Sequence, residues 1–387
     1  MPRFPQVSAT TSTLSTRVFS QLAVKAQARR AEGKVVHALS VGDTYHEPHI
    51  TARAEAQRTE DHPGLHQYAP VRGIPPLLDA VAERLAIVGR AVLRDQIQIM
   101  SGATSGLSVV CNALFDPGDE VLLPAPFWPL IRGIIASRGA VPVQIPFFDR
   151  LGDLDVEAVL EAAVTERTVA LYINTPHNPT GRVLSEDTIA AMVRVARKHK
   201  LWILTDEAYQ DLHFGERPAP VWARDDVQDC YVACHTLSKS YGIAGARIGY
   251  THGAPEAMKA IRGVQTFSTY CAPKPMQWGA VRALREGDPW LAARRAEYQR
   301  AGAEVAAAFE IEPPAGGTFV LVNAERYFRD GETDAMPFLD RCLDRGVLLT
   351  PGASCGEAYG SWVRVCFTSV PPAELTAALN AIRPLLG

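Results

Sequence analysis

The chain has 387 residues, enough to bury a large core and to form two domains. A net charge of -3 and a pI near 6.4 exclude the strongly basic surface that binds nucleic acid or anionic membranes. No apolar run approaches the roughly 20 residues that span a bilayer, so we expect neither a nucleic-acid nor a membrane partner.

The seven cysteines are scattered along the chain without a C-x-x-C pair. This spacing is typical of reduced thiols in a cytoplasmic protein, mostly buried, rather than of a disulfide framework or a zinc site. We therefore predict a cytoplasmic location and no metal.

The N-terminal segment, residues 1–31, contains basic side chains and no acidic one, which resembles an organelle transit peptide. Apolar residues in it follow a roughly helical spacing, at Val18, Leu22, Val24 and Ala28. They lead into the apolar run Val35–Val41. We predict a short disordered tail followed by an amphipathic helix of the mature fold.

The middle of the chain alternates helical patterns with short apolar strands. Helices are predicted at Ile74–Val88, Ser105–Leu114, Ser185–Lys198 and Asp288–Phe309. Strands are predicted at Gln96–Met100, Glu120–Pro124, Thr168–Asn174, Trp202–Asp206, Cys230–Thr236 and Ala246–Thr251. This alternation indicates a mainly parallel sheet covered by helices on both faces, with ligands at the carboxyl ends of its strands.

The rhythm changes after about residue 285, where a long helix leads to the glycine-rich start of an apolar strand, Gly316–Val322. A helix, two strands and a closing helix at Pro372–Leu386 follow. We predict a large domain at 45–285 and a smaller α+β domain at 286–387, completed by the N-terminal segment 1–44.

Small residues follow the first predicted strand, in the run Ser101–Gly106 before a helix. Free backbone amides at a helix N-terminus attract a phosphate, and Ala103 and Thr104 are the candidate contacts. An ordinary helix cap is the alternative. Neither an ATP-type phosphate loop nor a dinucleotide-binding glycine pattern is present.

Polar side chains stand at the ends of two further strands. The turn Thr175–Gly181, which contains two prolines, can hold Asn178 so that it donates to a ligand oxygen. Asp206 ends the next strand, where an anion would keep a heteroaromatic nitrogen protonated, and Tyr209 could bind a phenolic oxygen. A simple Asn-Pro turn and a solvated acidic strand end are the alternatives.

Trp128 follows the strand Glu120–Pro124, so its ring could stack on a flat ligand, although core packing would also explain it. Arg364 lies between apolar neighbours on the predicted strand Trp362–Thr368. An arginine in an interior strand usually needs a carboxylate or phosphate partner, which is either a ligand or a structural ion pair.

Lys239 lies in the run Ser238–Tyr250, where Gly242 and Gly245 would let the backbone pack closely. Arg247 follows eight residues after Lys239. A desolvated lysine amine is suited to form a Schiff base with an aldehyde, and Arg247 could bind a phosphate. A solvated lysine beside a turn is the alternative for this segment taken alone.

Three motifs in this order resemble those of the class I/II aminotransferases, and of their bacterial aspartate/aromatic branch in particular. They are N-P-T-G at Asn178–Gly181, D-E-x-Y at Asp206–Tyr209, and S-K-x-x-G-x-x-G-x-R-x-G-Y at Ser238–Tyr250. The resemblance extends from about Val35 to the C-terminal helix. It implies the fold type I of the enzymes that depend on pyridoxal 5'-phosphate: a three-layer αβα large domain and a smaller α+β domain.

The resemblance also implies a role for each matching residue. Lys239 would form the Schiff base and move the substrate proton, Asp206 would pair with the pyridine nitrogen, and Tyr209 and Asn178 would bind the ring oxygen. Ala103, Thr104, Ser238 and Arg247 would hold the phosphate, Trp128 would stack on the ring, and Arg364 would clamp the substrate carboxylate. Gly42 matches the glycine of a loop that closes over substrate. Tyr68 matches a tyrosine that reaches the phosphate of the neighbouring subunit, which implies a homodimer with shared active sites.

The implied reaction is ping-pong transfer of an amino group between an L-amino acid and a 2-oxo acid. A lyase, cyclase or oxidase reaction on the same scaffold stays an alternative, because the sequence does not report which substrate bond lies perpendicular to the ring. A non-catalytic regulatory domain is the third alternative; it would need loss of Lys239 or an appended DNA-binding segment.

The sequence departs from the family pattern in loops. Tyr45 and His46 replace family residues in the run Gly42–Pro48 and are candidates for the substrate entrance. His177 precedes the functional Asn178, and Ser354-Cys355 stands where a phenylalanine is common. These differences leave the side-chain specificity open, and no second cation for an acidic substrate can be assigned.

Overall fold

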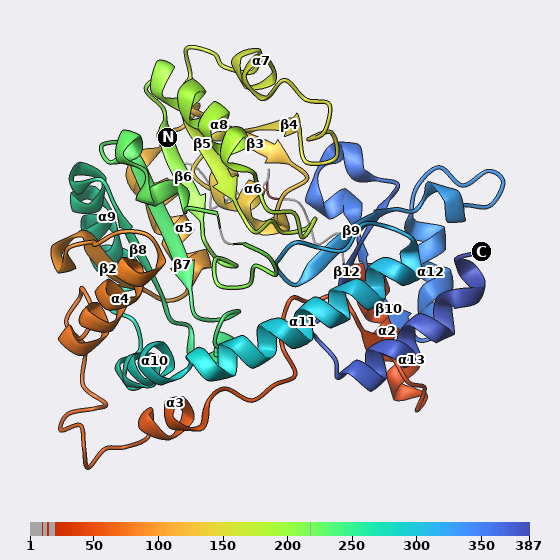
Figure 1. The fold of residues 1–387 in the computed structure, drawn as a ribbon, viewed down its shortest axis with the longest axis horizontal. Helices are drawn as coiled ribbons and strands as arrows, with labels where there is room; N and C mark the ends of the chain where they lie inside the picture. The colour runs from red at the N-terminus through yellow and green to blue at the C-terminus, as the bar shows by residue number, and fades with distance from the viewer. Residues whose placement is uncertain (1–9, 11–13, 15–19, 217) are drawn as a thin grey trace, which may run out of the picture.

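A seven-stranded sheet forms the centre of the computed structural model, with the strand order β2-β8-β7-β6-β5-β3-β4 (Figure 1). The structure describes residues 10, 14, 20–216 and 218–387. The strands are β2 (Ile97–Met100), β3 (Glu120–Ala125), β4 (Val141–Pro146), β5 (Thr168–Asn174), β6 (Trp202–Asp206), β7 (Tyr231–Thr236) and β8 (Gly249–Gly253). Neighbours from β4 to β7 pair in parallel, and β8 is antiparallel to both β2 and β7. The prediction of a mainly parallel sheet is confirmed.

Helices cover both faces of this sheet, and each face has its own core. Alternate residues of a strand point to opposite faces, so Leu171 and Ile203 join one apolar cluster while Ala170 and Leu204 join the other. The helices of this part are α3 (Ile50–Glu55), α4 (Pro75–Val88), α5 (Ala103–Leu114), α6 (Pro129–Ala136), α7 (Val156–Glu161), α8 (Glu186–Lys198), α9 (Pro255–Ser268) and α10 (Lys274–Glu286). Buried on both faces, the strands present only their ends to a ligand.

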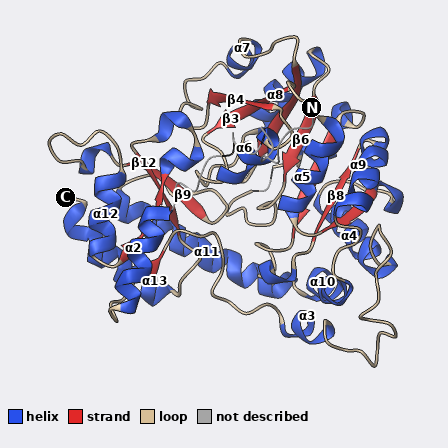
Figure 2. Cartoon of the chain, turned by 180° about the vertical axis from the view of Figure 1, so that it is seen from behind, coloured by secondary structure: helices blue, strands red, loops and turns tan. Residues whose placement is uncertain are grey.

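A second, smaller part of the molecule lies beyond the long helix α11 (Asp288–Phe309), which runs across the molecule between the two (Figures 1 and 2). Its antiparallel sheet has the order β11-β12-β9, and β1 pairs in parallel with β10. Its elements are β1 (His37–Ala38), β9 (Phe319–Asn323), β10 (Val347–Leu348), β11 (Thr350–Pro351), β12 (Trp362–Cys366), α12 (Met336–Asp344) and α13 (Pro372–Ile382). The N-terminal strand is thus built into the C-terminal part of the chain.

Helix α2 (Ser20–Ala31) occupies the region of the predicted N-terminal helix, but its buried face differs from the prediction. Leu22 and Ala26, one helical turn apart, are buried, whereas Val24 and Ala28 are exposed. Val18 and most of the predicted tail lie outside the described residues. Val24 and Ala28 do not share the face of Leu22 on a helix with 3.6 residues per turn, so the assumed spacing was too loose.

The last strand of the central sheet begins later than predicted. The expected strand Ala246–Thr251 is replaced by a 3₁₀ turn at Ala244–Ala246, after which β8 runs from Gly249 to Gly253. Arg247 has a φ of 54°, in the left-handed region, which is incompatible with a strand. The closing helix is also shorter, because α13 ends at Ile382 and a 3₁₀ turn follows.

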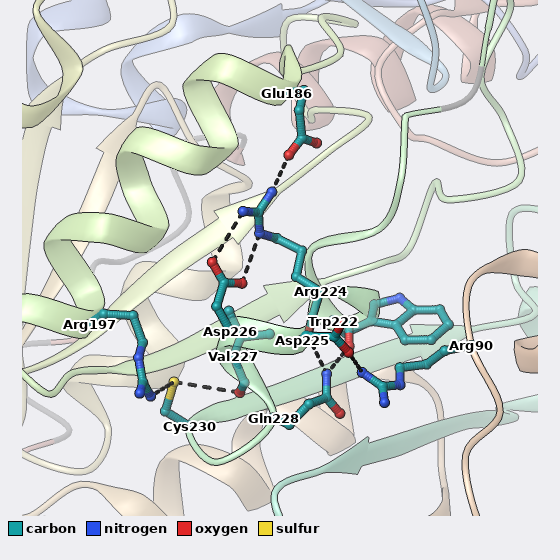
Figure 3. A network of polar contacts seen from close by, with 10 residues as sticks. All are labelled: Arg90, Glu186, Arg197, Trp222, Arg224, Asp225, Asp226, Val227, Gln228 and Cys230. Carbon is teal, nitrogen blue, oxygen red and sulfur yellow. Dashed lines mark hydrogen bonds and ion pairs between the residues drawn. The ribbon is translucent and has the colours of Figure 1, made fainter.

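The connection between β6 and β7 is held by a polar network that lies just before the first residue of β7 (Figure 3). Arg224 pairs with Asp226 at 3.1 Å and with Glu186 in the first turn of α8. Arg90 pairs with Asp225 at 3.0 Å, and the Gln228 amide donates to two backbone carbonyls of the same turn. The ion pairs hold the side chains of a long irregular connection, and the Gln228 amide gives partners to two of its backbone carbonyls.

In the part of the chain that the structure describes, every helix is too short or too polar to cross a membrane.

Candidate active site

A cavity of about 520 Å³ lies where the ends of the central strands face the smaller part of the molecule. It is lined by Leu22, Ala23, Ser40, Val41, Gly42, Ala103, Thr104, Trp128, Asn178, Asp206, Ala208, Tyr209, Thr236, Ser238, Lys239, Ala244, Arg247, Phe319, Leu348, Leu349, Thr350 and Arg364. All the predicted site residues except Tyr68 are among them. Residues far apart in the sequence therefore meet at one place, as expected for strand ends of a doubly covered sheet.

Lys239 follows β7 and is half-buried in this cavity. Its Nζ donates a hydrogen bond to the Gly42 carbonyl. Burial lowers the pKa of the Lys239 amine from its usual value, and the nearby Asp43 carboxylate opposes this effect. A neutral amine, the form that attacks an aldehyde, is therefore available at a lower pH than for an exposed lysine.

Asp206 ends β6 and is held by three contacts in the protein interior. Its Oδ2 accepts a hydrogen bond from the Tyr172 hydroxyl at 2.7 Å, and its Oδ1 accepts from the Ala208 amide at 3.1 Å. Asn174 at the end of β5 donates to the Asp206 carbonyl at 2.8 Å. Burial raises the pKa of the Asp206 carboxyl, while the Tyr172 and Ala208 hydrogen bonds oppose that rise. This buried carboxylate could face a cationic ring nitrogen.

A chain of hydrogen bonds links Tyr209, Asn178 and Arg364. The Asn178 side-chain amide donates to the Tyr209 hydroxyl at 3.2 Å and accepts from the Arg364 guanidinium at 3.1 Å. Burial raises the pKa of the Tyr209 phenol above its usual value. The backbone of Asn178 is fixed because its N–H donates to Asn174 Oδ1 at 2.9 Å. Asn178 therefore lies between a phenol and a cation at the cavity wall.

Arg364 on β12 is 7% exposed and has no carboxylate partner among the described residues. Its Nη2 donates to the Ser40 carbonyl at 3.0 Å, and its guanidinium lies over the Phe319 ring, 4.1 Å from the ring centre. The structural ion pair that would have explained a buried arginine is not formed in this region. A buried cation without a counter-ion, facing a cavity, is prepared for an anionic ligand.

The opposite end of the cavity is suited to a phosphate. Helix α5 begins at Ala103, after Gly102 at φ 82°, and no side chain caps its first amides. A Cβ on Gly102 would come within 2.5 Å of Arg247 Nη2, so glycine lets the guanidinium lie against this turn. Arg247 is exposed to the cavity and donates to the Ala244 carbonyl at 2.9 Å. The helix N-terminus and Arg247 together form an anion site.

Ser238 and Thr236 complete this end of the cavity, with their hydroxyl oxygens 2.8 Å apart. Gly249 is required nearby, since a Cβ there would lie 2.3 Å from the His235 carbonyl oxygen and 3.1 Å from the Ala103 nitrogen. The glycine thus allows β8 to pack against the turn that carries the first amides of α5.

Trp128 and Gly42 line the remaining walls. Trp128 directly precedes α6. Gly42 lies against Phe319, where a Cβ would come within 2.4 Å of the ring. This close approach brings the N-terminal loop to the amine of Lys239.

Tyr68 lies outside the cavity of its own chain. It is 82% exposed, and its ring meets the Tyr270 ring edge-on at 5.3 Å. The prediction that it serves a neighbouring subunit is not tested by a single chain.

Several cavity residues escaped the sequence analysis. Thr236 lies two residues before Ser238, and Phe319 lies in the predicted strand Gly316–Val322. Their positions in these segments could have identified them as cavity residues. Thr350 Oγ1 and Arg364 both donate to the backbone carbonyl of Ser40. Any residue has such a carbonyl, so the sequence gives no signal for this contact. Tyr172, which supports Asp206 from outside the cavity, was also missed, because it was read only as part of an apolar strand.

The unusual loop residues do not line the cavity as expected. The Tyr45 hydroxyl donates to Glu297 on α11, and His46 Nε2 lies 2.7 Å from the same carboxylate. Both side chains therefore contact α11 instead of lining the cavity. Burial raises the pKa of Glu297, but the Tyr45 and His46 hydrogen bonds outweigh it and lower the pKa overall.

The other two departures from the family pattern, at His177 and at Ser354-Cys355, make contacts outside the cavity. His177 stacks on Phe148 with ring centres 3.4 Å apart, and burial lowers its pKa well below the usual range. Cys355 is buried outside the cavity, and Ser354 donates to the Pro351 carbonyl at 2.7 Å.

The residues present fit pyridoxal 5'-phosphate. The cavity has an anion site at a helix N-terminus, a buried carboxylate at a strand end, a phenol with an amide beside it, and a lysine amine of lowered pKa. A second cation, Arg364, has no counter-ion among the described residues and is not needed for the phosphate. The donor set therefore matches both the cofactor and a carboxylate substrate.

The family model of aminotransferase class I and II matches residues 34–382. An arginine–pyruvate transaminase of Pseudomonas aeruginosa is 31% identical over 353 residues, which cover 88% of each chain. An aspartate/prephenate aminotransferase of Thermus thermophilus is 29% identical over 94% of each chain.

Solved structures agree with this match. The crystal structure of an aspartate aminotransferase from Rhizobium meliloti superposes with a TM-score of 0.92, with 26% identity over 99% of both chains. The fold is that of the fold-type-I aminotransferases. The chain therefore belongs to the class I and II aminotransferases, enzymes that depend on pyridoxal 5'-phosphate and act on amino acids and 2-oxo acids.

Proposed function

We propose that Lys239 is the cofactor-binding lysine of this aminotransferase and that Arg364 binds the α-carboxylate of its substrate. The observation that carries the proposal is the position of Arg364, a buried guanidinium with no carboxylate partner, in the same cavity as the Lys239 amine. Arg364 would bind the α-carboxylate, a group that every L-amino acid has, so this contact would hold the substrate independently of its side chain.

The cofactor would be held by residues of the central strand ends. Its phosphate would be bound by Ala103, Thr104, Ser238 and Arg247, its ring nitrogen by Asp206, its ring oxygen by Tyr209 and Asn178, and its ring face by Trp128. When bound, pyridoxal 5'-phosphate supplies an aldehyde that condenses with amines and a ring that accepts electrons from the substrate Cα.

The chain's own residues supply position and proton transfer. The Lys239 amine, with its lowered pKa, removes the substrate Cα proton and returns a proton during transfer of the amino group. The Tyr172 hydroxyl and the Ala208 amide donate to Asp206 and favour its ionised form against the effect of burial, so that Asp206 would stabilise a positive charge beside it. Arg364 and Asn178 fix the carboxylate end, so that the Cα faces the amine.

We further propose a cytoplasmic homodimer in which Tyr68 contacts the partner's site. The exposure of Tyr68 and its contact with the exposed Tyr270 support a surface that a second copy covers. The pairing of β1 with β10 supports the assignment of the segment before the 44/45 boundary to the smaller domain. The break between α10, which ends at Glu286, and α11, which begins at Asp288, supports the boundary at 285/286. The free cysteines support the reducing compartment.

A half-reaction experiment tests the proposal. The purified holoenzyme is mixed with an amino acid and no 2-oxo acid, and absorbance is followed. We expect the lysine-bound cofactor band to disappear and one equivalent of 2-oxo acid to form, with parallel double-reciprocal plots in the steady state. Ammonia or hydrogen peroxide instead would identify a lyase or an oxidase reaction, and a cyclised product would identify a cyclase.

A matched pair of variants separates Lys239 from other lysines. Lys239→Ala should lose the band of lysine-bound cofactor and about 10²–10⁴-fold in kcat, as expected when the group that transfers protons is removed. Lys259→Ala, on the exposed surface of α9, should keep both. Full turnover of Lys239→Ala would contradict the assignment.

A further inference from the structure

We propose that His177 is a positioning residue for the cofactor ring: its side chain joins the end of β3 to the turn after β5 and so fixes Trp128 relative to Asn178. This inference rests on the proposed function, in which Trp128 stacks on the ring and Asn178 binds the ring oxygen. His177 itself lies outside the cavity wall, so it would act through these two neighbours and not by touching cofactor or substrate.

The central sheet opens between β3 and β5 at its carboxyl edge. The pairing of these two strands ends at Leu122 and Leu171, although both strands continue. Each strand stays paired with its other neighbour to its last residue, since β3 pairs with β4 as far as Ala125 and β5 pairs with β6 as far as Asn174. The chain order also changes direction here, because β4 lies on one side of β3 and β5 on the other. Backbone hydrogen bonds of the sheet therefore do not hold the two strand ends to each other.

The two separated strand ends lead into the two turns that would hold the cofactor ring. Pro126 and Phe127 connect β3 to Trp128. The turn after β5 carries His177 and Asn178. Trp128 and Asn178 both line the cavity. A ring that stacks on one of them and is hydrogen-bonded by the other needs a fixed distance between the two turns.

The His177 side chain bridges this opening. Its ring donates a hydrogen bond to the Pro126 carbonyl, in the turn after β3. It also stacks on Phe148, with ring centres 3.4 Å apart and an angle of 10° between the planes. Phe148 is held to the end of β3, because its N–H donates to the Ala125 carbonyl at 3.0 Å. Two contacts of one side chain thus reach from the turn after β5 to the end of β3.

The second ring nitrogen of His177 is used within its own turn. Nδ1 lies 2.8 Å from Thr180 Oγ1. A neutral imidazole has one N–H, and a carbonyl can only accept, so the ring donates to Pro126 while Nδ1 accepts from the Thr180 hydroxyl. Burial lowers the pKa of His177 well below its usual range and so favours this neutral form. The bridge therefore does not titrate near neutral pH.

The contacts of His177 do not depend on a second copy of the chain. Its side chain is 1% exposed and that of Phe148 is 2% exposed. Pro126 is buried as well. A neighbouring subunit has no access to a ring so enclosed, and the bridge is a property of the single chain.

Loss of the bridge should weaken the cofactor site more than the substrate site. The buried Pro126 carbonyl would lack its partner, and the distance between Trp128 and Asn178 would no longer be fixed. Arg364 would keep its contact with the Ser40 carbonyl, which comes from another part of the chain. Cofactor affinity and kcat should therefore fall, while KM should change less.

Two amide substitutions test the link across the opening. In His177→Gln, the amide nitrogen takes the place of the ring N–H that faces Pro126. In His177→Asn, the shorter amide reaches only the place of Nδ1, beside Thr180 in its own turn. Both variants lose the stack on Phe148, so the difference between them reports the link to Pro126.

The dissociation constant of pyridoxal 5'-phosphate and the steady-state constants are measured for both variants. We expect His177→Asn to bind the cofactor about tenfold more weakly and to have an about tenfold lower kcat, with KM changed less than about twofold, the effect of one buried group left unpaired. His177→Gln should stay within about threefold of the parent in all three. Equal constants in the two variants contradict the bridge.

His252→Asn is the matched control for general destabilisation. His252 is a buried histidine of β8, whose ring contacts the Tyr231 hydroxyl at 3.1 Å and the His235 ring at 3.0 Å. Burial lowers its pKa to about 3, so it is neutral like His177. We expect a lower Tm with the parent's cofactor affinity and kcat. If this variant loses cofactor as His177→Asn does, His177 has only a packing role.

Hydrogen exchange of the holoenzyme gives a readout that does not depend on turnover. The Phe127 N–H donates to the Cys355 carbonyl at 2.8 Å, so its peptide reports the turn that carries Trp128. Exchange in this peptide should be faster in His177→Asn than in His177→Gln; equal rates overturn the inference and leave the proposed function intact. If the parent forms no 2-oxo acid in the half-reaction, the proposed function fails, and the exchange rates still decide whether His177 bridges the two turns.

Discussion

The two walls of the cavity are built from different kinds of backbone. The wall that would hold the cofactor consists of the ends of β5, β6 and β7 and the first turn of α5, inside a seven-stranded sheet. The wall that would face the substrate side chain consists of α2, the residues after β1, and the two-residue strands β10 and β11.

The difference lies in how the polar groups are fixed. On the cofactor wall, Asp206 accepts hydrogen bonds from Tyr172 and Asn174 of β5, and the Asn178 N–H donates to the Asn174 side chain. On the substrate wall, the contacts are aliphatic side chains and one backbone carbonyl, that of Ser40. The hydrogen bonds of the cofactor wall strongly restrict which residue can occupy each position. The aliphatic positions of the other wall tolerate substitution by other apolar residues of similar size. The two walls of the cavity are therefore supplied by separate segments of the chain.

The largest effect is expected at the point where the two walls meet. Arg364→Met removes the guanidinium that would bind the substrate carboxylate. Loss of a charged, hydrogen-bonded pair costs about 3 kcal/mol, so we expect kcat/KM to decrease roughly 100-fold. The variant should still bind one cofactor per chain, because Arg364 would hold neither the phosphate nor the ring nitrogen. Steady-state kinetics and the cofactor content of the same sample check both parts. Loss of the cofactor from the variant would mean that Arg364 is needed to hold it.

Tyr172→Phe is expected to have the next largest effect, on the cofactor wall alone. Its hydroxyl stabilises the Asp206 anion, so its loss raises the pKa of that carboxyl further and weakens its support of the ring nitrogen. We expect kcat to fall about tenfold, the cost of roughly one hydrogen bond to a charged group, with an unchanged KM. The pH at which the cofactor spectrum titrates should also move.

Tyr231→Phe is the control for this substitution. Its hydroxyl contacts His252 at 3.1 Å in the core, away from the cavity, and burial raises its pKa to about 12. If both variants lose stability and neither shifts the cofactor spectrum, Tyr172 has only a packing role.

Glu297→Gln should affect the attachment of the N-terminal loop. The hydrogen bonds from Tyr45 and His46 depress the pKa of Glu297, so its contribution to stability is present above the unfolded pKa and is lost as the pH falls through the folded value. At neutral pH we expect the variant to have a Tm about 1–2 °C lower than the parent, the effect of about one hydrogen bond. The difference should shrink in acid, below a pH of about 4.5. A Tm difference independent of pH would contradict this account.

The smallest effect is expected from Asp43→Asn. The Asp43 carboxylate raises the pKa of Lys239 against the effect of burial, so its removal should lower that pKa further and increase the fraction of neutral amine at pH 8. We expect the apoprotein to take up cofactor about twofold faster at that pH, as for a screened surface charge. Stopped-flow absorbance measures the rate, and slower uptake would show that Asp43 acts otherwise.

The cofactor wall could be predicted from the sequence because each of its side chains follows a strand of recognisable pattern. Thr168–Asn174 and Trp202–Asp206 were predicted with the bounds that the structure has. Asp206 lines the cavity, and Asn174 holds Asp206 and Asn178 in place. The start of β8 was misplaced, since apolar residues around Arg247 suggested a strand while its backbone is left-handed.

The substrate wall was not predictable in the same way. Tyr45 and His46 were expected at the entrance but contact α11, because a loop sequence does not specify which neighbour will supply its hydrogen bonds. The role of Ser40 depends on a backbone carbonyl, and β10 and β11 are too short to give a periodic pattern.

The most direct test of the account is to identify the lysine that carries the cofactor. The holoenzyme is reduced with borohydride, digested, and the peptides are analysed by mass spectrometry. The account predicts one mole of pyridoxyl group per chain, attached to Lys239 in the peptide that contains Ser238 and Ser240. Label on another lysine, with Lys239 unmodified, would contradict it.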